Sequence, residues 1–445
     1  MDRLPGFLPA LPSVVRVRIL IWHGYLLGGT GSNVYTRSLA RAWSRLGHEV
    51  VVLCQEPHPE QFDLTGARVV RPKIDTRLPV FVLDRYPDLP ACRLPEMGPT
   101  EVGRFVEANV AAVRAQGQAD FLLANHVLLG GPVGAGSGLP FAVKAHGSEL
   151  EFSMRGNAEL CRWARESLAT AHAVLAGSEH VARVLHDVVG PGEYARRVHV
   201  LPPGVDVDML RPQDRAAAVK ALVEQCRLDA PNPPTAHDER RPDEGNAERL
   251  GRFLAGMQPT VLYVGKLSPE KGVSLLIGAL AGVDARAVIV GFGPQRADLE
   301  AQVRELAPPA RDGIVFTGPL EHRHLAHLWP LADVSVTPSM FPEAFGMVAA
   351  EAAACGSPPL VARHSGLAEV AAALEREYPA RYRHLSGFTP GDQDELTAKL
   401  TELVLLPRGE WEQISAAARR VAVRQWSWGG IARSILDLME AAARD

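Results

Sequence analysis

The sequence predicts an α/β protein with two domains, each built on a doubly wound sheet. Its 445 residues exceed the usual size of a single domain. Both halves alternate short apolar runs, rich in β-branched residues, with segments of helical periodicity. Apolar runs of this kind are typical of parallel strands that are buried on both faces. The two halves do not repeat in sequence, yet each consists of successive βα units.

The first half opens with a β-loop-α-β unit. We expect a strand over 15–22, a glycine-rich loop over 28–33, a helix over 34–46 and a second strand over 49–53. Loop glycines allow backbone amides to approach an anionic or bulky ligand. A dinucleotide fingerprint would need a further glycine where Val34 stands, so a nicotinamide site is disfavoured here.

Four more apolar runs in the first half are expected to extend this sheet: 121–124, 141–145, 173–176 and 198–201. Polar residues follow two of these runs at the carboxyl edge, where open α/β sheets bind ligands. One of them gives His146 and the other gives Ser178. His146 could orient or polarise a substrate hydroxyl, but a single histidine after a strand is more often structural. The residues alone leave both interpretations open.

A turn at 202–206 ends the first half, so the first domain is expected over 1–205. We expect a linker over 206–258, because 229–251 is polar, contains prolines and has few apolar residues. Such a composition buries too little surface to offset the entropy of ordering, so this stretch is predicted to be a mobile insertion. The second domain is expected over 259–424.

Strands in the second half are expected over 260–264, 287–290, 314–317 and 333–336. Lys266 and Lys271 flank the loop after the first of these strands, where an anionic diphosphate would need compensating charge. Lysines are common on surfaces, so each alone says little. Their position is informative, because both fall on the same predicted sheet edge as Glu343.

The stretch 337–361 contains two glutamates, Glu343 and Glu351, separated by seven residues. If this run is helical, the two carboxylates lie within roughly 80° of each other around its axis. A helix that starts near 344–346 would point its free amides out of the sheet edge, which suits phosphate. Carboxylates suit sugar hydroxyls, because each can accept hydrogen bonds from a diol. The combination predicts a sugar nucleotide; the alternative is an Ala-rich helix with two solvated glutamates.

Composition and charge limit the possible partners and compartments. A formal net charge of −4 does not indicate nucleic acid. The five cysteines are scattered without a C-x-x-C spacing, which argues against a disulfide framework or a zinc site and favours a reducing compartment. The N-terminus is broken by prolines and does not resemble a signal peptide, and no run approaches the roughly 18 apolar residues that span a bilayer. We expect a cytoplasmic protein; peripheral membrane contact stays open.

Three histidines, His322, His324 and His327, have the spacing of a loose metal cluster. They lie among charged residues, so we expect them on the solvated face of an exposed helix. No metal or other cofactor is expected.

Five motifs in order resemble those of the retaining glycosyltransferases of family four. The most specific is 338–356, which contains Glu343-Ala344-Phe345-Gly346, Glu351 and Cys355-Gly356. The other four are 265–272 with both lysines, the turn 203–206, the loop 28–33, and His146-Gly147. The resemblance covers the chain from about residue 15 to the C-terminal helices. It implies the GT-B architecture, in which two Rossmann-like domains face each other across a deep cleft, with the C-terminal helix of about 425–445 packed back on the first domain.

The resemblance also implies roles for individual residues. Glu343 would meet the donor sugar's hydroxyls, Glu351 the ribose, and Lys266 and Lys271 the diphosphate, and His146 would lie near the reacting sugar. The remaining donor-binding positions implied are Gly29, Gly31, Thr317, Leu320, Ala344, Phe345, Gly346 and Met347. The catalytic set would be His146, Lys266, Lys271 and Glu343.

The sequence departs from the family pattern at several of these motifs. Lys266 stands where the family more often has arginine, Ala344 where proline or glycine is common, Glu149 where aspartate is frequent, and Ser365-Gly366 where two glycines are usual. None of these differences removes a required charge.

The function implied is transfer of a sugar, with retention of anomeric configuration, from a nucleotide-diphosphate sugar to a hydroxyl acceptor. A uridine sugar is the preferred donor, and a front-face route without a metal fits a site of cations and amides. A sugar-nucleotide isomerase on the same architecture and a non-catalytic sugar-nucleotide-binding protein are the alternatives. The sequence does not identify the acceptor.

Overall fold

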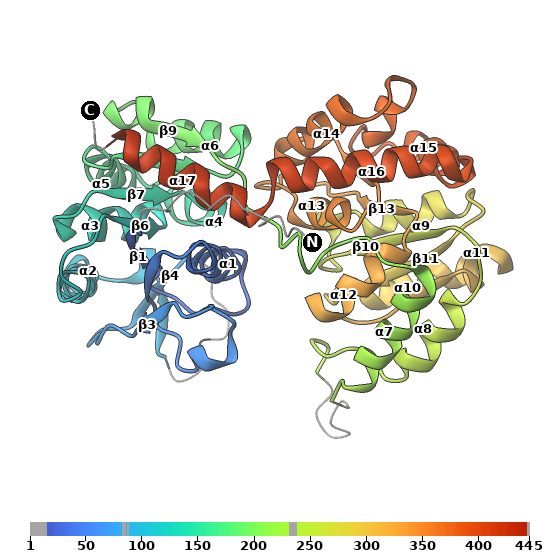
Figure 1. Ribbon diagram of the computed structural model, residues 1–445, viewed down its shortest axis with the longest axis horizontal. Coiled ribbons are helices and arrows are strands. Elements are labelled where there is room, and N and C mark those ends of the chain that lie inside the picture. The colour runs from blue at the N-terminus through green and yellow to red at the C-terminus, as the bar shows by residue number, and fades with distance from the viewer. Residues whose placement is uncertain (1–15, 82–85, 87–88, 231–237, 443–445) are drawn as a thin grey trace, which may run out of the picture. The chain divides into compact units, whose positions relative to one another are not determined.

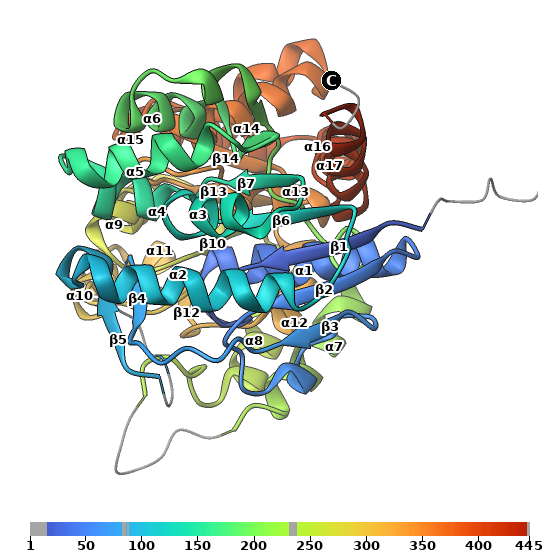
Figure 2. The same cartoon turned by 90° about the vertical axis from the view of Figure 1, so that its left-hand side faces the viewer.

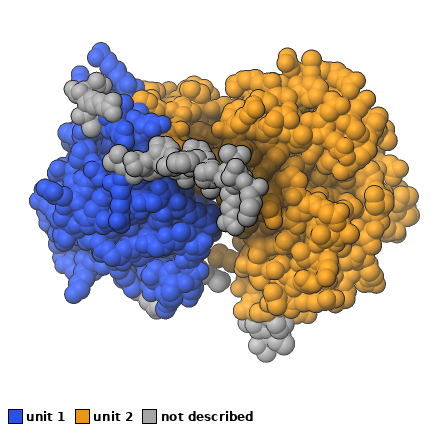
Figure 3. All heavy atoms as spheres, in the orientation of Figure 1, with its two compact units in different colours: residues 1–174, 188–197, 435–445 blue, residues 175–187, 198–434 orange. Residues whose placement is uncertain are grey.

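The computed structural model describes residues 16–81, 86, 89–230 and 238–442. Two compact units divide the chain (Figure 3). Unit 1 comprises Met1–Val174, Val188–Arg197 and Ile435–Asp445, and unit 2 comprises Leu175–Asp187 and Val198–Ser434. The boundary therefore passes through a strand of the first sheet and through the last helix.

The first sheet is seven-stranded and has the order β3-β2-β1-β6-β7-β8-β9 (Figure 1). Its strands are β1 (Arg18–Trp22), β2 (Glu49–Leu53), β3 (Arg68–Val70), β6 (Phe121–Asn125), β7 (Phe141–Lys144), β8 (Ala173–Ala176) and β9 (Val198–Val200). β1 pairs in parallel with both β2 and β6, which makes it an interior strand. The apolar runs predicted as strands are strands here, and burial on both faces explains why they lack alternation. A separate two-stranded sheet joins β4 (Leu78–Val80) to β5 (Ala91–Arg93).

Helices pack against the first sheet. They are α1 (Gly31–Arg45), α2 (Pro99–Arg114), α3 (Val127–Ser137), α4 (Gly147–Glu149), α5 (Ala158–Leu168) and α6 (Glu179–Val189). Figure 2 shows α2, α3 and α5 side by side, with α3 in contact with both neighbours and with β6 and β7. α1 starts at Gly31, three residues earlier than predicted, so Gly31 belongs to the first helical turn and not to the loop.

The second sheet is six-stranded, with the order β12-β11-β10-β13-β14-β15, and all of its pairings are parallel. Its strands are β10 (Thr260–Val264), β11 (Arg286–Val290), β12 (Ile314–Phe316), β13 (Val334–Thr337), β14 (Pro359–Ala362) and β15 (Gly387–Phe388). The two described sheets confirm the prediction of two Rossmann-like α/β domains.

The remaining described α-helices belong to unit 2, except that α17 passes into unit 1 at Ile435. They are α7 (Arg215–Arg227), α8 (Asn246–Leu254), α9 (Val273–Leu280), α10 (Arg296–Glu305), α11 (Pro308–Asp312), α12 (His322–Leu328), α13 (Met347–Ala354), α14 (Ser365–Glu377), α15 (Gln393–Leu405), α16 (Arg408–Gln425) and α17 (Trp428–Ala442). α16 lies along α13 and α14 (Figure 1). The alanines of α13 are fully buried, because small side chains let this helix lie close to α16 and the sheet.

The stretch 229–251 is not the unstructured insertion that its composition predicted. α8 begins within it at Asn246 and continues to Leu254; it packs against α7 and buries Ala247, Leu250 and Leu254 in the core of unit 2. These few apolar residues share one helical face, so they are sufficient to anchor the helix despite the polar composition. Residues 231–237 of the predicted insertion lie outside the described residues.

Among the helices described, none combines the length and the apolar character needed to cross a membrane.

Candidate functional site

The carboxyl ends of the strands carry polar clusters in both units, as the sequence predicted for open sheets. The clusters are described one unit at a time.

In unit 2 an ion pair joins two loops that are far apart in sequence. Lys271 ends the short helical turn Pro269–Lys271 after β10, and Glu343 follows β13. Lys271 Nζ donates to Glu343 Oε1, and Ser339 Oγ donates to the same oxygen at 2.7 Å. The side chains of Lys271 and Glu343 keep 35% and 23% exposure, so both remain accessible to a ligand. The sequence correctly placed them at one sheet edge.

The backbone around Glu343 is fixed by its neighbours at Ser365 and Gly366. Glu343 N–H donates to Ser365 Oγ at 2.8 Å, and Gly366 N–H donates to Glu343 O at 3.0 Å. A Cβ on Gly366 would lie 2.5 Å from Phe345 Cα, so only glycine fits there. Ser365, which stands where the family usually has glycine, uses its hydroxyl to hold the loop.

The loop that carries the lysines packs directly against the glutamate loop. Gly272 has φ +67°, and a Cβ there would meet Pro338 O at 2.0 Å. Met340 N–H donates to Glu270 O at 2.7 Å. A hydrogen bond from Ser268 and the charges of the two lysines hold the pKa of Glu270 below its usual value. The two loops therefore form one surface.

Lys266 is exposed and makes no ion pair with any residue that the structure describes. Its carbonyl accepts a hydrogen bond from Tyr263 Oη at 2.8 Å, which fixes its backbone. Burial and the charge of Glu343 raise the pKa of Tyr263 above its usual value, so Tyr263 lies close enough to sense that carboxylate. Lys266 thus extends from the same edge with a free ammonium group.

α13 begins with unpartnered amides. Gly346 precedes it with φ +111°, and a Cβ there would meet Leu367 Cδ2 at 2.5 Å. Within the described chain, the amides of Phe345, Gly346, Met347 and Val348 donate no hydrogen bond. The Phe345 ring is buried against Trp426, whereas Ala344 is exposed and its carbonyl accepts from Ser178 Oγ at 2.5 Å. A helix start of this kind suits an anion.

The two glutamates do not share a helix, so the predicted angle of about 80° does not apply. α13 starts at Met347, after Glu343, because the preceding residues form the turn fixed by Ser365. Glu351 lies on α13, is 8% exposed and accepts from His322 Nε2 at 2.9 Å. Each carboxylate therefore has its own cationic or donor partner.

Thr317 is fully buried and its polar atoms are occupied. Its carbonyl accepts from Asp243 N–H at 2.8 Å and from Asn246 Nδ2 at 2.9 Å, and its hydroxyl donates to Gly318 O at 2.8 Å. Leu320 is 9% exposed, and its amide has no partner in the described chain. Of these two predicted donor-binding positions, only Leu320 offers a backbone donor without a partner among the described residues.

In unit 1 the glycine loop opens onto solvent. Gly29 is exposed with φ +89°, a conformation that favours glycine. Nothing lies within 4 Å of a Cβ placed on Gly29 or Gly31. The first amides of α1 start at Gly31, so this loop and helix start can also accommodate an anion.

His146 lies directly after β7, within a buried cluster. Its Nε2 lies 3.0 Å from Asn125 Oδ1, and its ring packs 4.5 Å from that of His126. Burial, with the charge of Lys144, lowers the pKa of His146 well below its usual value, so the imidazole is neutral. Burial also lowers the pKa of Lys144 to about 7 and raises that of Glu149 to about 7.

Sequence reasoning missed His126. It follows β6 with φ +72°, is 2% exposed, and neither ring nitrogen has a hydrogen-bond partner among the residues that the structure describes. Its ring lies between those of His23, Tyr25, Phe81 and His146. The available signal was its place immediately after the predicted strand 121–124, at the same edge as His146.

The three histidines of α12 have separate partners. His322 contacts Glu351, His327 contacts Gln213, and His324 contacts Asp229. The expectation of a solvated face is wrong for His324, which is fully buried because α12 packs against α7.

Comparisons with known proteins agree with this architecture. A model described as glycosyl transferases group 1 matches residues 248–421, and one described as Glycosyltransferase Family 4 matches residues 29–209. A D-inositol 3-phosphate glycosyltransferase from Xylanimonas cellulosilytica is 30% identical over 253 residues, 56% of this chain and 52% of its own. The enzyme of the same name from Mycobacterium bovis is 31% identical over 281 residues, 60% of this chain and 55% of its own. The chain thus spans about half the length of these curated relatives.

Solved structures match nearly the whole chain at low sequence identity. Anabaena HepE, solved in complex with UDP, has a TM-score of 0.67 at 18% identity and covers 95% of this chain and 100% of its own. Sucrose-phosphate synthase from Thermosynechococcus elongatus has a TM-score of 0.64 at 21% identity, covering 96% and 100%. These likenesses support the GT-B fold. Since the two family models together match most of the sequence, the chain belongs to the group 1, family 4 glycosyltransferases.

Proposed function

We propose that this protein is a retaining glycosyltransferase that moves a hexosyl unit from a UDP-sugar to a hydroxyl acceptor without a bound metal. One observation carries the proposal: Lys271 and Ser339 hold one oxygen of Glu343 beside a helix start whose first amides have no partner. Cations and free amides suit a diphosphate, and a carboxylate suits sugar hydroxyls. The UDP complex of HepE, which shares the fold, supports the choice of nucleotide.

The diphosphate would lie against Lys266, Lys271 and the amides that begin α13. As the glycosidic bond breaks, negative charge grows on the leaving phosphate, and fixed positive groups stabilise that charge more than they stabilise the ground state. Lys271 already contacts Glu343, which keeps its ammonium at this place before a donor arrives. The proposal needs no metal, because these groups supply the positive charge.

Glu343, Glu351 and Leu320 would position the rest of the donor. The exposed carboxylate of Glu343 would accept from sugar hydroxyls, Glu351 from the ribose, and the free amide of Leu320 would meet the base. In unit 1, Gly29 and Gly31 would bring backbone amides to the diphosphate. The neutral imidazole of His146 would hydrogen-bond the reacting sugar.

The transfer itself would follow a front-face route. The bond between the anomeric carbon and the diphosphate oxygen breaks, and the acceptor oxygen bonds to the same face of that carbon. The acceptor's proton passes to the departing phosphate oxygen. This route needs no covalent nucleophile on the protein. Water must be kept from the donor so that it does not hydrolyse it, and closure of a transferase around its donor excludes water.

A thermal-shift panel of UDP-, GDP- and ADP-sugars, each with and without magnesium, tests the donor assignment. We expect a UDP-sugar to raise the Tm in both conditions, because a ligand that binds only the folded state stabilises it. Lys271→Ala should abolish most of the shift, whereas Lys220→Ala, at an exposed position of α7, should preserve it. A shift that depends on magnesium, or one that Lys271→Ala leaves intact, contradicts the proposal.

Turnover assays then separate the reaction classes. The acceptor panel should include inositol 3-phosphate, because the curated relatives carry that name. A transferase forms product only with an acceptor, an isomerase converts the donor alone, and a binding protein does neither. NMR of the product should show the donor's anomeric configuration; an inverted product would contradict retention.

A further inference from the structure

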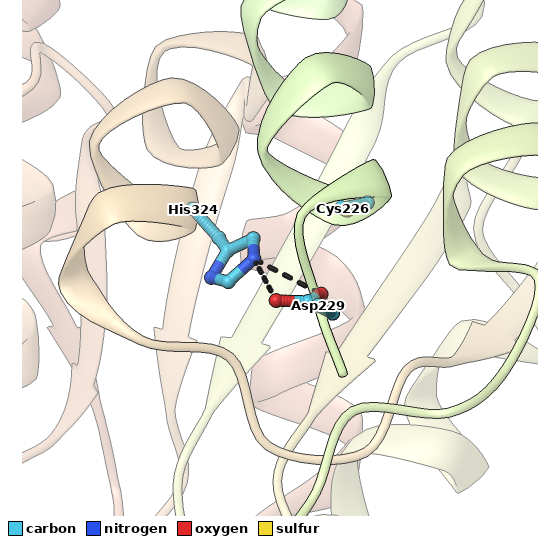
Figure 4. Close-up of side chains that lie close together, drawn as sticks. All are labelled: Cys226, Asp229 and His324. Atoms are coloured by element: carbon cyan, nitrogen blue, oxygen red, sulfur yellow. Dashed lines mark hydrogen bonds and ion pairs between the residues drawn. The ribbon is translucent and has the colours of Figure 1, made fainter. Parts of the chain in front are cut away.

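Three side chains with different ligand atoms meet where α12 packs against the end of α7 (Figure 4). Cys226 lies in the last turn of α7, Asp229 follows that helix, and His324 lies in the first turn of α12. One ligand atom from each residue lies within 4.8 Å of the other two. Cys226 is 8% exposed and His324 is fully buried, so two of the three are shielded from water.

The local backbone places Cys226 and Asp229 on the same side. Asp229 N–H donates to Cys226 O at 3.4 Å, so the two residues are one turn apart and their side chains are neighbours. His324 Nε2 lies 3.0 Å from Asp229 Oδ1 and 3.1 Å from Oδ2. Arg323 donates to Oδ1 at 2.8 Å, which orients the carboxylate.

We propose that Cys226, Asp229 and His324 form a binding site for one zinc-like divalent cation, with water as the fourth ligand. Thiolate, imidazole and carboxylate are the ligands that zinc uses, and three protein ligands with one open position are a known zinc arrangement. Tetrahedral bonds of ordinary length would hold the three ligand atoms about 3.3–3.6 Å apart. His324 Nε2 already lies 3.0 Å from Asp229 Oδ1, so only the Cys226 sulfur, which lies within 4.8 Å of both ligand atoms, would have to move closer, by at most about 1.5 Å. The outer contact from Arg323 would hold the carboxylate in place.

Binding requires two protons to move. Zinc binds the thiolate form of cysteine, so the metal must displace the thiol proton of Cys226 into solvent. The proton on His324 Nε2 would shift to Nδ1, at the expense of the bond that Nδ1 accepts from Glu321 N–H. That bond is 3.3 Å long and correspondingly weak. Affinity should therefore rise with pH.

A metal bound here would link α7 to α12. It shares no residue with the donor-binding set, so a metal here is compatible with a metal-independent transfer. The sequence search missed it because it looked for C-x-x-C, whereas the chain uses C-x-x-D with a distant histidine.

Metal titration of the full chain, stripped with a chelator and without any nucleotide, tests the proposal. We expect one equivalent of Zn²⁺ to bind and raise the Tm, and Co²⁺ to give a thiolate-to-cobalt charge-transfer band. Cys226→Ser should abolish the band, and His324→Gln should weaken Zn²⁺ binding at least tenfold. Cys161→Ser and His327→Gln are the matched controls, because Cys161 is a more exposed thiol and His327 lies on the same helix.

Two results would contradict the proposal that these residues bind a metal. One is the absence of submillimolar Zn²⁺ binding by the wild-type chain, which would leave the three residues as a hydrogen-bonded link only. The other is binding that survives both Cys226→Ser and His324→Gln while Cys161→Ser removes it. Because no donor is present, either failure leaves the glycosyltransferase proposal untouched.

Discussion

Glu343 and Glu351 are held by different groups. Glu343 shares one oxygen between Lys271 and Ser339 in a partly exposed loop. Glu351 is nearly buried on α13 and contacts His322. In the proposed complex the first carboxylate therefore serves the reacting sugar and the second serves the nucleoside.

Replacing each glutamate by glutamine should separate these tasks. A hydrogen bond to a charged group is worth about 1.5–3 kcal/mol, so Glu351→Gln should weaken UDP binding roughly tenfold or more. Glu343→Gln should leave UDP affinity within about threefold, since UDP has no transferred sugar, and lower kcat by about a hundredfold. Calorimetry with UDP and initial rates with the UDP-sugar measure the two effects. Equal losses of UDP affinity in both variants would contradict the division.

Glu149 makes the stability of unit 1 depend on pH. Its carboxylate is fully buried and accepts from the backbone amides of Leu128 and His146. Burial raises its pKa from 4.5 to about 7. Between these values the unfolded chain loses the proton and the folded chain keeps it, so the free energy of unfolding falls as pH rises. The effect is complete near pH 7.

Glu149→Gln should remove this titration. Relative to wild type, the variant should gain stability as pH rises from 4.5 to 7, by about 1.4 kcal/mol for each unit of pKa shift, and then stay level. Urea unfolding across this range measures the difference. The control is Glu151→Gln, whose side chain is 34% exposed and paired with Arg155. Because Glu151 is not buried as Glu149 is, this variant should not reproduce the rise. The buried histidines titrate in every variant and cancel in the comparison.

At the scale of elements, α13 depends on the glycine that precedes it. Gly346 has φ +111°, and a Cβ there would lie 2.5 Å from Leu367 Cδ2. Gly346→Ala should cost about 1–3 kcal/mol of stability and weaken UDP-sugar binding, because the start of α13 moves. Gly409→Ala is the control: it lies in α16 with open space around a Cβ and should stabilise by about 0.5–1 kcal/mol. Unchanged donor affinity in Gly346→Ala would contradict the role of these amides.

The elements that the sequence predicted well are those that local pattern determines. The predicted bounds of β2 and β8 agree with the observed strands, because an apolar, β-branched run between two helices is most readily accommodated as a buried strand. α8 was missed because composition outweighed the spacing of three apolar residues. The start of α13 was predicted near 344–346, within one residue of the observed start at Met347, but the turn before it depends on Ser365 and Gly366 and was not predicted. Tertiary contacts of this kind leave no local signal.

The same limit applies to the candidate site. Lys271 and Glu343 could be paired from sequence, because both follow parallel strands of one sheet. The sequence could not predict the partner of Glu351 or the environment of His126, because both depend on which helices and rings pack together. The sheet edge was predictable and the contacts on it were not.

At the scale of the whole molecule, the proposal requires one donor to engage both units. Free amides begin α13 in unit 2 and α1 in unit 1, and the exposed Gly29 precedes the latter. Amides that accept a phosphate should exchange with solvent deuterium more slowly. A UDP-sugar should therefore protect 345–348 and also 29–33, whereas α10 should be unaffected and free glucose should protect neither segment. Protection limited to unit 2 would remove Gly29 and Gly31 from the site, and protection in neither unit would contradict the donor assignment itself.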